Sequence, residues 1–338
     1  MSYKFRSVRF LFGLSLLSIG LLAACGSGPT DTNSKQSDGA IVSKAPEPSE
    51  SAPVNKEEAE PEADRVFTDE LGHEVVVPEA PVRIFAPYME DALLTLGVEP
   101  VAQWSNGNQG HRYLEDKLQG IPKMDFSGGM PSSEELLSYE PDLIILHTAN
   151  YAENGVYENY SKIAPTYVFS NAAGDVEKSL EKLGELIGKT DEVNQALESY
   201  RQKVNEAKAA IEQNASGKKV AIIRFASRGV SLMGGNYFCG YVINQHLGMD
   251  MTPLAEDENS LNISLEILPE LDADYIFVIN AYGQGTERMK EMTESNIWKS
   301  IPAVQQGHVY EVNDEYWLGS GLIAYEKIID DVVKLLAR

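Results

Sequence analysis

The sequence predicts an α/β protein of two lobes, each with a mostly parallel central sheet, joined by one long helix. Short apolar runs alternate with helical patterns in residues 65–174 and again in residues 215–338, which is typical of parallel sheets flanked by helices. Between them, residues 190–213 carry apolar side chains at helical spacing. The two halves also share a local pattern, in which a segment with a glutamate precedes an aspartate and an apolar strand.

In the first half, residues 66–77 alternate in polarity around Leu71-Gly72, which predicts a β-hairpin. Helices are expected at 90–96 and 133–139. Strands are expected at 82–85, 100–104, 142–146 and 164–169. The order of these elements predicts a parallel sheet covered by helices.

The second half repeats this rhythm. Strands are expected at 219–225, 275–279 and 308–312, and helices at 241–247, 264–271 and 322–336. The repeated pattern is Glu134 before Asp142 in the first half, and Glu266 before Asp274 in the second. We therefore expect two lobes of similar design.

The segment 175–214 is the predicted connector. One helix runs to about residue 187, Gly188 ends it, and Thr190 is a plausible N-cap for the helix at 190–213. About 24 residues give a helix of roughly 36 Å, long enough to run along both lobes. The alternative is two ordinary surface helices of a single domain.

Residues 1–24 read as a signal peptide, with three basic residues before an apolar run at 10–24 that is too short for a stable membrane span. Leu22-Ala23-Ala24-Cys25-Gly26 resembles a bacterial lipobox, which implies a diacylglyceryl group on Cys25. Residues 25–64 are rich in Pro, Ser and Glu, so we expect a flexible tether. The alternative is an ordinary secretory signal that contains a cysteine by chance.

Composition excludes several classes of protein. The chain carries 51 acidic and 28 basic residues among 338, a formal charge of −23, which argues against nucleic-acid binding. Two cysteines exclude a disulfide scaffold and a cysteine-based zinc module. We find no nucleophile elbow and no phosphate-binding loop, so we expect a binding protein and no enzyme.

The chain resembles the substrate-binding lipoproteins of iron–siderophore ABC importers, in the helical-backbone (class III) group that also includes cobalamin and haem binders. The resemblance covers residues 65–336. It rests on the joint order of motifs that are individually weak, which lie at 66–72, 93–98, 134–145, 161–166, 263–277 and 298–310. It implies Rossmann-like lobes with a ligand cleft between them. It also implies a protein anchored by lipid on the extracytoplasmic face of the cell membrane, which we expect to be monomeric.

The resemblance also implies ligand-binding residues in the cleft. Arg224 ends the strand at 219–225 and matches an arginine that holds siderophore oxygens in relatives, with Arg228 a second candidate. Aromatic contacts with the ligand are expected from Tyr316, Trp317, Tyr88, Trp104, Tyr237 and Phe238.

One segment departs from the pattern of the family. Relatives often place an arginine or lysine after the strand at 142–146, but residues 147–154 contain no such base. Glu90 and Asp91 are expected nearby. We therefore favour a ferric hydroxamate or citrate–hydroxamate over a highly anionic triscatecholate.

The resemblance implies a permease dimer with its ATPase as the partner, and one docking carboxylate on each lobe. Glu134 and Glu266 are the candidates, with Glu135 the rival of Glu134. A glutamate near a helix N-terminus can also act only on the helix dipole.

Other ligands and functions stay open. Haem or cobalamin is an alternative cargo, and His147 and Tyr151 are conceivable axial ligands for haem. No protein-held metal is expected, because the five histidines are scattered. A sensory or adhesive lipoprotein is the alternative from another class.

Overall fold

The structure is a computed structural model that describes residues 65–255 and 258–337. The predicted signal peptide, Cys25 and tether therefore lie outside the described residues. In the described part of the chain, none of the helices combines the length and the apolar character that crossing a membrane requires.

The first lobe is built on a three-stranded parallel sheet of order β3-β6-β7. Its central strand β6 (Leu143–Leu146) is buried on both faces, as its apolar run predicts. Leu143 and Ile145 face one hydrophobic core, and Ile144 and Leu146 face another. The strands that flank it are β3 (Ile84–Phe85) and β7 (Thr166–Val168).

Smaller elements surround this sheet. They are the antiparallel hairpin β1 (Arg65–Thr68) and β2 (Glu74–Val77), the parallel pair β4 (Gln103–Ser105) and β5 (Lys123–Asp125), the helices α1 (Glu90–Thr95), α2 (Ser133–Leu137) and α3 (Val156–Tyr160), and the 3-10 turns η1 (Arg112–Leu114) and η2 (Ala149–Ala152).

The second lobe contains a six-stranded mixed sheet. Strand β8 (Lys219–Ala226) pairs in parallel with β12 (Tyr275–Asn280), which pairs in parallel with β13 (Val309–Val312). On its other side, β8 pairs in parallel with the short β10 (Asp250–Met251) and forms an antiparallel hairpin with β9 (Gly229–Met233). Strand β11 (Ser260–Ile263) extends the hairpin as an antiparallel edge, which the sequence patterns do not predict.

Helical elements cover this sheet. Helix α6 (Phe238–Tyr241) continues into a π-helical turn η4 (Val242–His246), where the sequence predicts one α-helix. The others are η5 (Leu265–Glu270), η6 (Ala281–Gly283), α7 (Thr286–Glu294), α8 (Asn296–Ser300), α9 (Pro302–Gln305), α10 (Asp314–Trp317) and α11 (Leu322–Leu336). The segment predicted as a helix at 264–271 is the 3-10 element η5, and it contains Pro269.

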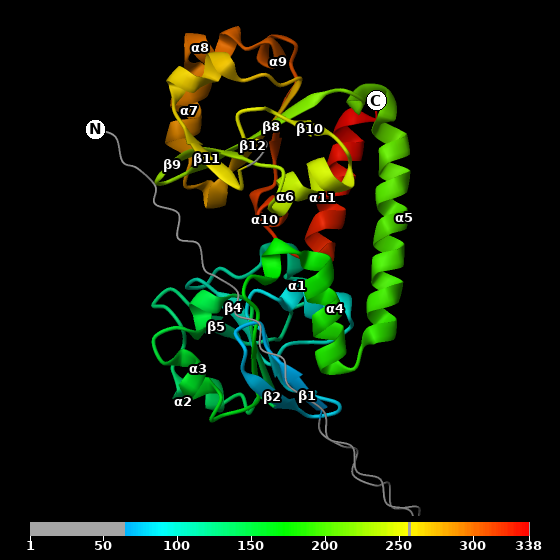
Figure 1. The fold of residues 1–338 in the computed structure, drawn as a ribbon. Helices are drawn as coiled ribbons and strands as arrows, with labels where there is room; N and C mark the ends of the chain where they lie inside the picture. The colour runs from blue at the N-terminus through cyan, green and yellow to red at the C-terminus, as the bar shows by residue number, and fades with distance from the viewer. Residues whose placement is uncertain (1–64, 256–257, 338) are drawn as a thin grey trace, which may run out of the picture. The chain divides into compact units, whose positions relative to one another are not determined.

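The connector consists of η3 (Ala172–Gly174), α4 (Val176–Ile187) and the long helix α5 (Thr190–Ala215). Gly188 adopts φ 69° and ends α4, as predicted, but Lys189 and not Thr190 occupies the N-cap position of α5. Helix α11 packs along α5 (Figure 1), and the Asn214 side chain donates a hydrogen bond of 2.8 Å to the Leu336 carbonyl.

A continuous hydrophobic core links both lobes with the connector. It includes Leu93 from the first lobe, Tyr200 from α5, and Phe277 and Ile328 from the second lobe. The outer face of each sheet packs into a core of its own lobe. The lobes therefore share their interior as well as a covalent connection.

A buried carboxylate joins the two lobes at the start of α11. Asp91, on α1 of the first lobe, accepts hydrogen bonds of 3.0 Å from the backbone amides of Ile323 and Ala324, and one of 3.1 Å from the Tyr113 hydroxyl. The two amides belong to the first turn of α11, where a negative charge is favoured by the helix dipole. A Cβ atom at Gly321 would lie 2.2 Å from Asp91, so only glycine lets the carboxylate approach.

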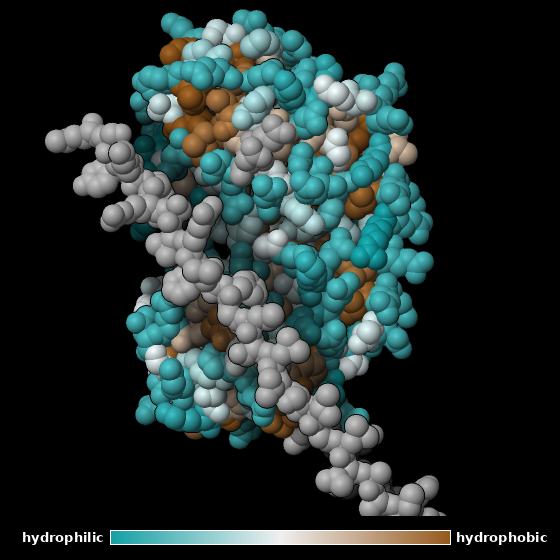
Figure 2. All heavy atoms as spheres, viewed as in Figure 1, coloured by the Kyte–Doolittle hydropathy of each residue, from teal (hydrophilic) through white to brown (hydrophobic). Residues whose placement is uncertain are grey.

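Hydrophilic side chains cover most of the face that Figure 2 shows for the described residues, and apolar side chains gather in smaller groups. This surface agrees with the acidic composition of the chain.

We expect Gly321→Ala to lower the free energy of unfolding by about 2 kcal/mol or more, because the new methyl group displaces the Asp91 carboxylate and because φ is 139° at this position. Gly128→Ala is the matched control, since its Cβ would meet no atom within 4 Å. Urea unfolding of both variants measures the difference. Equal stability of the two variants would contradict the role assigned to Asp91.

Candidate functional site

A cavity of about 770 Å³ lies between the two lobes and the connector. The first lobe contributes residues from the segments that follow its strands, among them Tyr88, Trp104 and His147. The second lobe contributes Arg224 and Tyr237, and α4 of the connector contributes Leu180. The volume lies in the range of cavities that hold small organic ligands.

Aromatic rings form the wall of the cavity in the first lobe. Tyr88 lies at the centre, with ring centroids 4.6 Å from Trp104 and 4.7 Å from His147. Tyr151 packs edge-on against His147 at 4.6 Å, and His111 lies 5.0 Å from Trp104. These rings present a rigid apolar surface with few rotatable bonds.

Three aromatic residues of the cavity have strained backbone conformations. Tyr88, Phe238 and Tyr282 adopt φ of 66°, 48° and 53°, the left-handed region that side chains other than glycine rarely occupy. They come from both lobes. Such strain concentrates at binding sites, where the surrounding structure holds a side chain in a required position.

Several buried polar atoms of the cavity residues have no hydrogen-bond partner among the described residues. They are Trp104 Nε1, His147 Nδ1 and Arg224 Nε, whereas His111 Nε2 makes no hydrogen bond but lies 3.4 Å from Glu90 Oε2. Burial lowers the pKa of His147 to about 4, so its imidazole is neutral at neutral pH. A ligand with several acceptor oxygens would supply partners for these atoms.

The charged groups of the cavity nearly balance. Among the described residues that line it, the cations are Arg112 and Arg224, and the carboxylates are Asp91 and Glu315. Arg112 Nε lies 2.8 Å from Glu315 Oε1 and is therefore paired. The buried carboxylate of Glu90 stands behind the wall, where its Oε1 accepts a hydrogen bond of 2.7 Å from the Trp104 amide.

Five of the residues named from the sequence as ligand contacts line the cavity, namely Arg224, Tyr88, Trp104, Tyr237 and Phe238. His147 lines it as well, and Tyr151, which is not among the lining residues, packs edge-on against His147. Arg228 does not line it, because it lies exposed in the two-residue turn between β8 and β9.

Trp317 and Tyr316, which the resemblance led us to expect as ligand contacts, are not among the residues that line the cavity. Trp317 is fully buried, packs against Phe277 and donates a hydrogen bond from Nε1 to Asp331. The Tyr316 hydroxyl donates to the same carboxylate at 2.8 Å. Both side chains point from α10 toward α11, away from the cavity, and Glu315 of the same helix lines it instead.

No pattern in the sequence singled out four residues that line the cavity, namely Arg112, His111, Tyr282 and Glu315. Arg112 and His111 belong to the irregular segment between β4 and β5, where no periodic pattern assigns an element. If side chains alternated in direction along residues 308–316, Glu315 and Tyr316 would point to opposite sides. That pattern would still not indicate that Glu315 pairs with Arg112 of the other lobe.

The proposed docking carboxylates are exposed, one on each lobe. Glu134 lies on α2, where the Ser132 hydroxyl caps the helix by accepting from the Glu135 amide. Glu135 is exposed as well, so the rivalry between the two stays open. Glu266 lies on η5, and a hydrogen bond with the Ser264 side chain lowers its pKa.

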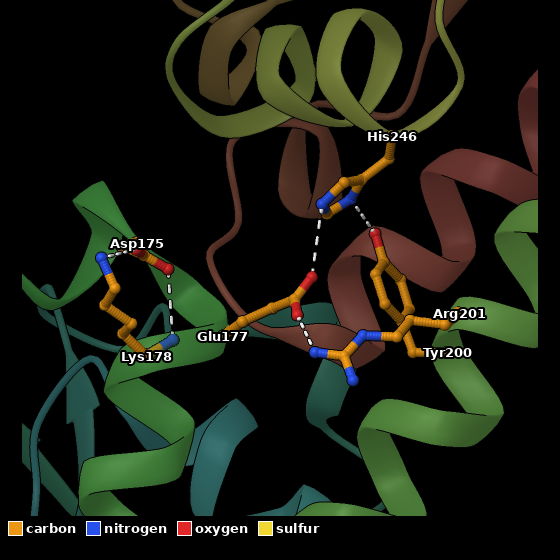
Figure 3. A network of polar contacts seen from close by, with 6 residues as sticks. All are labelled: Asp175, Glu177, Lys178, Tyr200, Arg201 and His246. Carbon is orange, nitrogen blue, oxygen red and sulfur yellow. Dashed lines mark hydrogen bonds and ion pairs between the residues drawn. The ribbon is translucent and has the colours of Figure 1, made fainter.

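A polar network joins the connector to the second lobe beside α5 (Figure 3). Glu177 of α4 reaches His246 of η4 at 3.5 Å and Arg201 of α5 at 2.6 Å. The Tyr200 hydroxyl lies 2.5 Å from His246 Nδ1. Burial lowers the pKa of His246, so the neutral ring bridges a tyrosine and a carboxylate.

Among the described residues, no three His, Cys, Asp or Glu side chains are grouped so that they could hold a metal ion. The site is thus a cavity between lobes with a rigid aromatic wall, unpartnered donors and one unpaired arginine.

A model of the periplasmic binding protein family matches residues 88–316, more than half of the chain. The chain belongs to the periplasmic binding protein family. Proteins of this family bind solutes and are not enzymes, which confirms the expectation from the sequence. The two-lobed fold and the resemblance to siderophore-binding proteins of ABC transporters are confirmed as well.

Individual periplasmic binding proteins are similar over nearly the whole chain. The probable siderophore-binding lipoprotein YfiY of Bacillus subtilis (strain 168) is 26% identical, over 97% of this chain and 97% of its own length. The iron(3+)-hydroxamate-binding protein FhuD of the same organism is 28% identical, over 96% of each chain.

Solved structures of periplasmic binding proteins share the fold. The crystal structure of Staphylococcus aureus SirA complexed with staphyloferrin B superposes with a TM-score of 0.69 at 24% identity, and it covers 80% of this chain and 98% of its own. A periplasmic binding protein component of a Fep/Fec-like ferrichrome ABC transporter from Bacillus subtilis gives a TM-score of 0.68 at 26% identity, covering 80% of this chain and 100% of its own.

We expect Asp91 to make the stability of the protein depend on pH. Burial raises the pKa of its carboxyl to about 6, against the lowering effect of its three hydrogen-bond donors. Because this pKa is higher in the folded than in the unfolded state, the contribution of Asp91 to the free energy of unfolding is full below about pH 4 and is lost as the pH rises through about 6.

Urea unfolding of the wild type and of Asp91→Asn at several pH values tests this expectation. The stability of the wild type relative to the variant should fall by on the order of 3 kcal/mol between about pH 4 and 7. If the difference in unfolding free energy between wild type and variant is constant with pH, or rises with pH, the pKa of the Asp91 carboxyl is not raised in the folded protein.

Proposed function

We propose that this protein captures a ferric siderophore, of the hydroxamate or citrate–hydroxamate type, and delivers it to an ABC permease for iron uptake. The observation that carries the proposal is the cavity itself, in which an aromatic wall and polar side-chain atoms without a hydrogen-bond partner surround one unpaired arginine. Such donors suit the oxygens of a hydroxamate or citrate complex, because they do not compete with those oxygens for the metal.

The relatives support this class of ligand. One relative is named as an iron(3+)-hydroxamate-binding protein and another as an Fe(3+)-citrate-binding protein. The small net charge of the cavity favours a ferric complex of low charge over a triscatecholate, because an unbalanced charge in a buried site is costly.

The anchoring and the partner complete the proposal. We place a lipid on Cys25 after cleavage of residues 1–24, and residues 25–64 as the tether that holds a monomeric protein at the extracytoplasmic face of the cell membrane. Beyond the tether we assign residues 65–174 and 215–338 to the lobes and residues 175–214 to the connector. Glu134 and Glu266 would each dock against an arginine of a permease dimer that works with its ATPase. Because carboxylate–arginine pairs are directional, the two contacts would align the lobes with the dimer.

Titration of the purified protein with ferric hydroxamates, citrate, catecholates, haem and cobalamin, followed by tryptophan fluorescence, tests the function. Trp104 lines the cavity and is the expected reporter, so Trp104→Phe should remove most of the quenching. Haem belongs in the panel because His147 presents a neutral imidazole to the cavity. No saturable response in the micromolar range or below to any of these compounds would overturn the proposal.

We expect Arg224→Ala to weaken binding of the preferred ferric complex at least about tenfold, or 1.4 kcal/mol. The guanidinium lines the cavity, and its Nε has no hydrogen-bond partner until a ligand oxygen supplies one. Arg228→Ala is the matched control, because it removes the same charge from an exposed turn outside the cavity. Equal affinities of the two variants would show that Arg224 does not contribute to the binding site.

The double variant Glu134→Ala/Glu266→Ala should abolish uptake of the iron complex by cells while its affinity for that complex stays intact. Glu135→Ala/Glu270→Ala is the control, with the same loss of charge from the same two elements. Loss of uptake only in this second pair would transfer the docking role away from Glu134 and Glu266.

A further inference from the structure

An ion pair crosses the cavity from one lobe to the other. Arg112 lies on η1 of the first lobe, and Glu315 lies on α10 of the second. Arg112 Nε is 2.8 Å from Glu315 Oε1, and its NH2 group is 3.8 Å from Asp314 Oδ1. Both Arg112 and Glu315 line the cavity.

The carboxylate side of this pair is held firmly. The Asn313 side chain caps α10 by accepting from the Glu315 amide at 2.9 Å. Asp314 accepts a hydrogen bond of 2.6 Å from the Tyr282 amide. Only 17% of the Glu315 side chain is exposed, whereas 53% of the Arg112 side chain is. Arg112 is therefore the more exposed partner, and Glu315 is the more buried one.

The pair decides how much positive charge a ligand meets. Among the described residues that line the cavity, Arg112 and Arg224 are the cations, and only Arg112 has a carboxylate within ion-pair distance. Asp91, the other carboxylate in the lining, already accepts hydrogen bonds from α11 and Tyr113. Without this pair, a ligand would meet two guanidinium groups that have no carboxylate partner. Because Arg112 is paired, a ligand meets only the unpaired guanidinium of Arg224.

We propose that Glu315 is a specificity-determining residue. It pairs with Arg112 and thereby lowers the affinity of the cavity for highly anionic ferric complexes. This inference rests on the proposed function and deepens it. Three hydroxamate anions balance a ferric ion, whereas three catecholate dianions leave the complex with a threefold negative charge. Such a complex would have to displace Glu315 from Arg112 and would then lie next to a partly desolvated carboxylate, which repels it.

Replacement of Glu315 by glutamine keeps the size of the side chain and removes the nearer of the two carboxylates that pair with Arg112, leaving only Asp314 at 3.8 Å. We expect Glu315→Gln to bind a ferric triscatecholate about tenfold or more tightly than the wild type, while its affinity for ferrioxamine B, a ferric trishydroxamate, changes less than about threefold. Glu311→Gln is the matched control, because it removes the same charge from the exposed side of β13 outside the cavity. Fluorescence titration measures all three proteins.

A double-mutant cycle separates this role from a general effect of charge or structure. In an Arg112→Gln background, Glu315→Gln should no longer raise affinity for the triscatecholate, because the guanidinium that it releases is gone. Equal gains with and without Arg112, equal gains for both complexes, or a gain of the same size in Glu311→Gln would overturn the inference.

Failure of the proposed function gives a different result. If the wild type binds none of the ferric hydroxamate, citrate and catecholate complexes of the fluorescence panel, ferric-siderophore capture is wrong, and the comparison of variants still decides the role of Glu315. New binding of the triscatecholate by Glu315→Gln would support that role even then, and its absence would refute it.

Discussion

The hydrogen bonds between Asp91 and the first turn of α11 are the constraint on which the site depends. They join a buried carboxylate of the first lobe to a helix of the second lobe that packs along the connector. Asp91 also lines the cavity, so the same residue joins the two lobes and forms part of the binding site. A charge buried in this way is tolerated only because backbone and hydroxyl donors surround it.

Two further contacts hold the lobes at other points. Glu177 of the connector meets His246 of the second lobe beside α5, and Arg112 of the first lobe meets Glu315 of the second at the cavity. With the shared hydrophobic core, these contacts restrict large hinge motions and leave small changes at the exposed Arg112 side chain. Recognition of a ligand therefore depends on side chains that are already in place more than on closure of the lobes.

Much of the fold follows from the sequence, because parallel strands buried on both faces leave a plain apolar pattern. The runs at 142–146 and 275–279 predict β6 and β12, and the spacing of apolar residues predicts α5 and α11. The antiparallel strands β9 and β11 were missed, because their residues do not alternate cleanly. The 3-10 and π-helical turns depend on tertiary contacts that a local pattern does not contain.

The candidate site is less predictable for a physical reason. Arg224, Tyr88 and Trp104 lie at or near the ends of predicted strands, and the position alone brings them to the cavity. Trp317 and Glu315 differ only in the direction in which they leave a short helix, which packing in α10 decides. The pairing of Arg112 with Glu315 joins residues about two hundred positions apart, and no local pattern reports such a contact.

The strained backbone of Tyr88, Phe238 and Tyr282 has a thermodynamic consequence for the empty protein. The free energy that holds these three aromatic side chains in position is spent during folding, so a ligand does not have to order them. Association then loses little conformational entropy of the protein. The folded protein carries that strain as a reduction of its own stability.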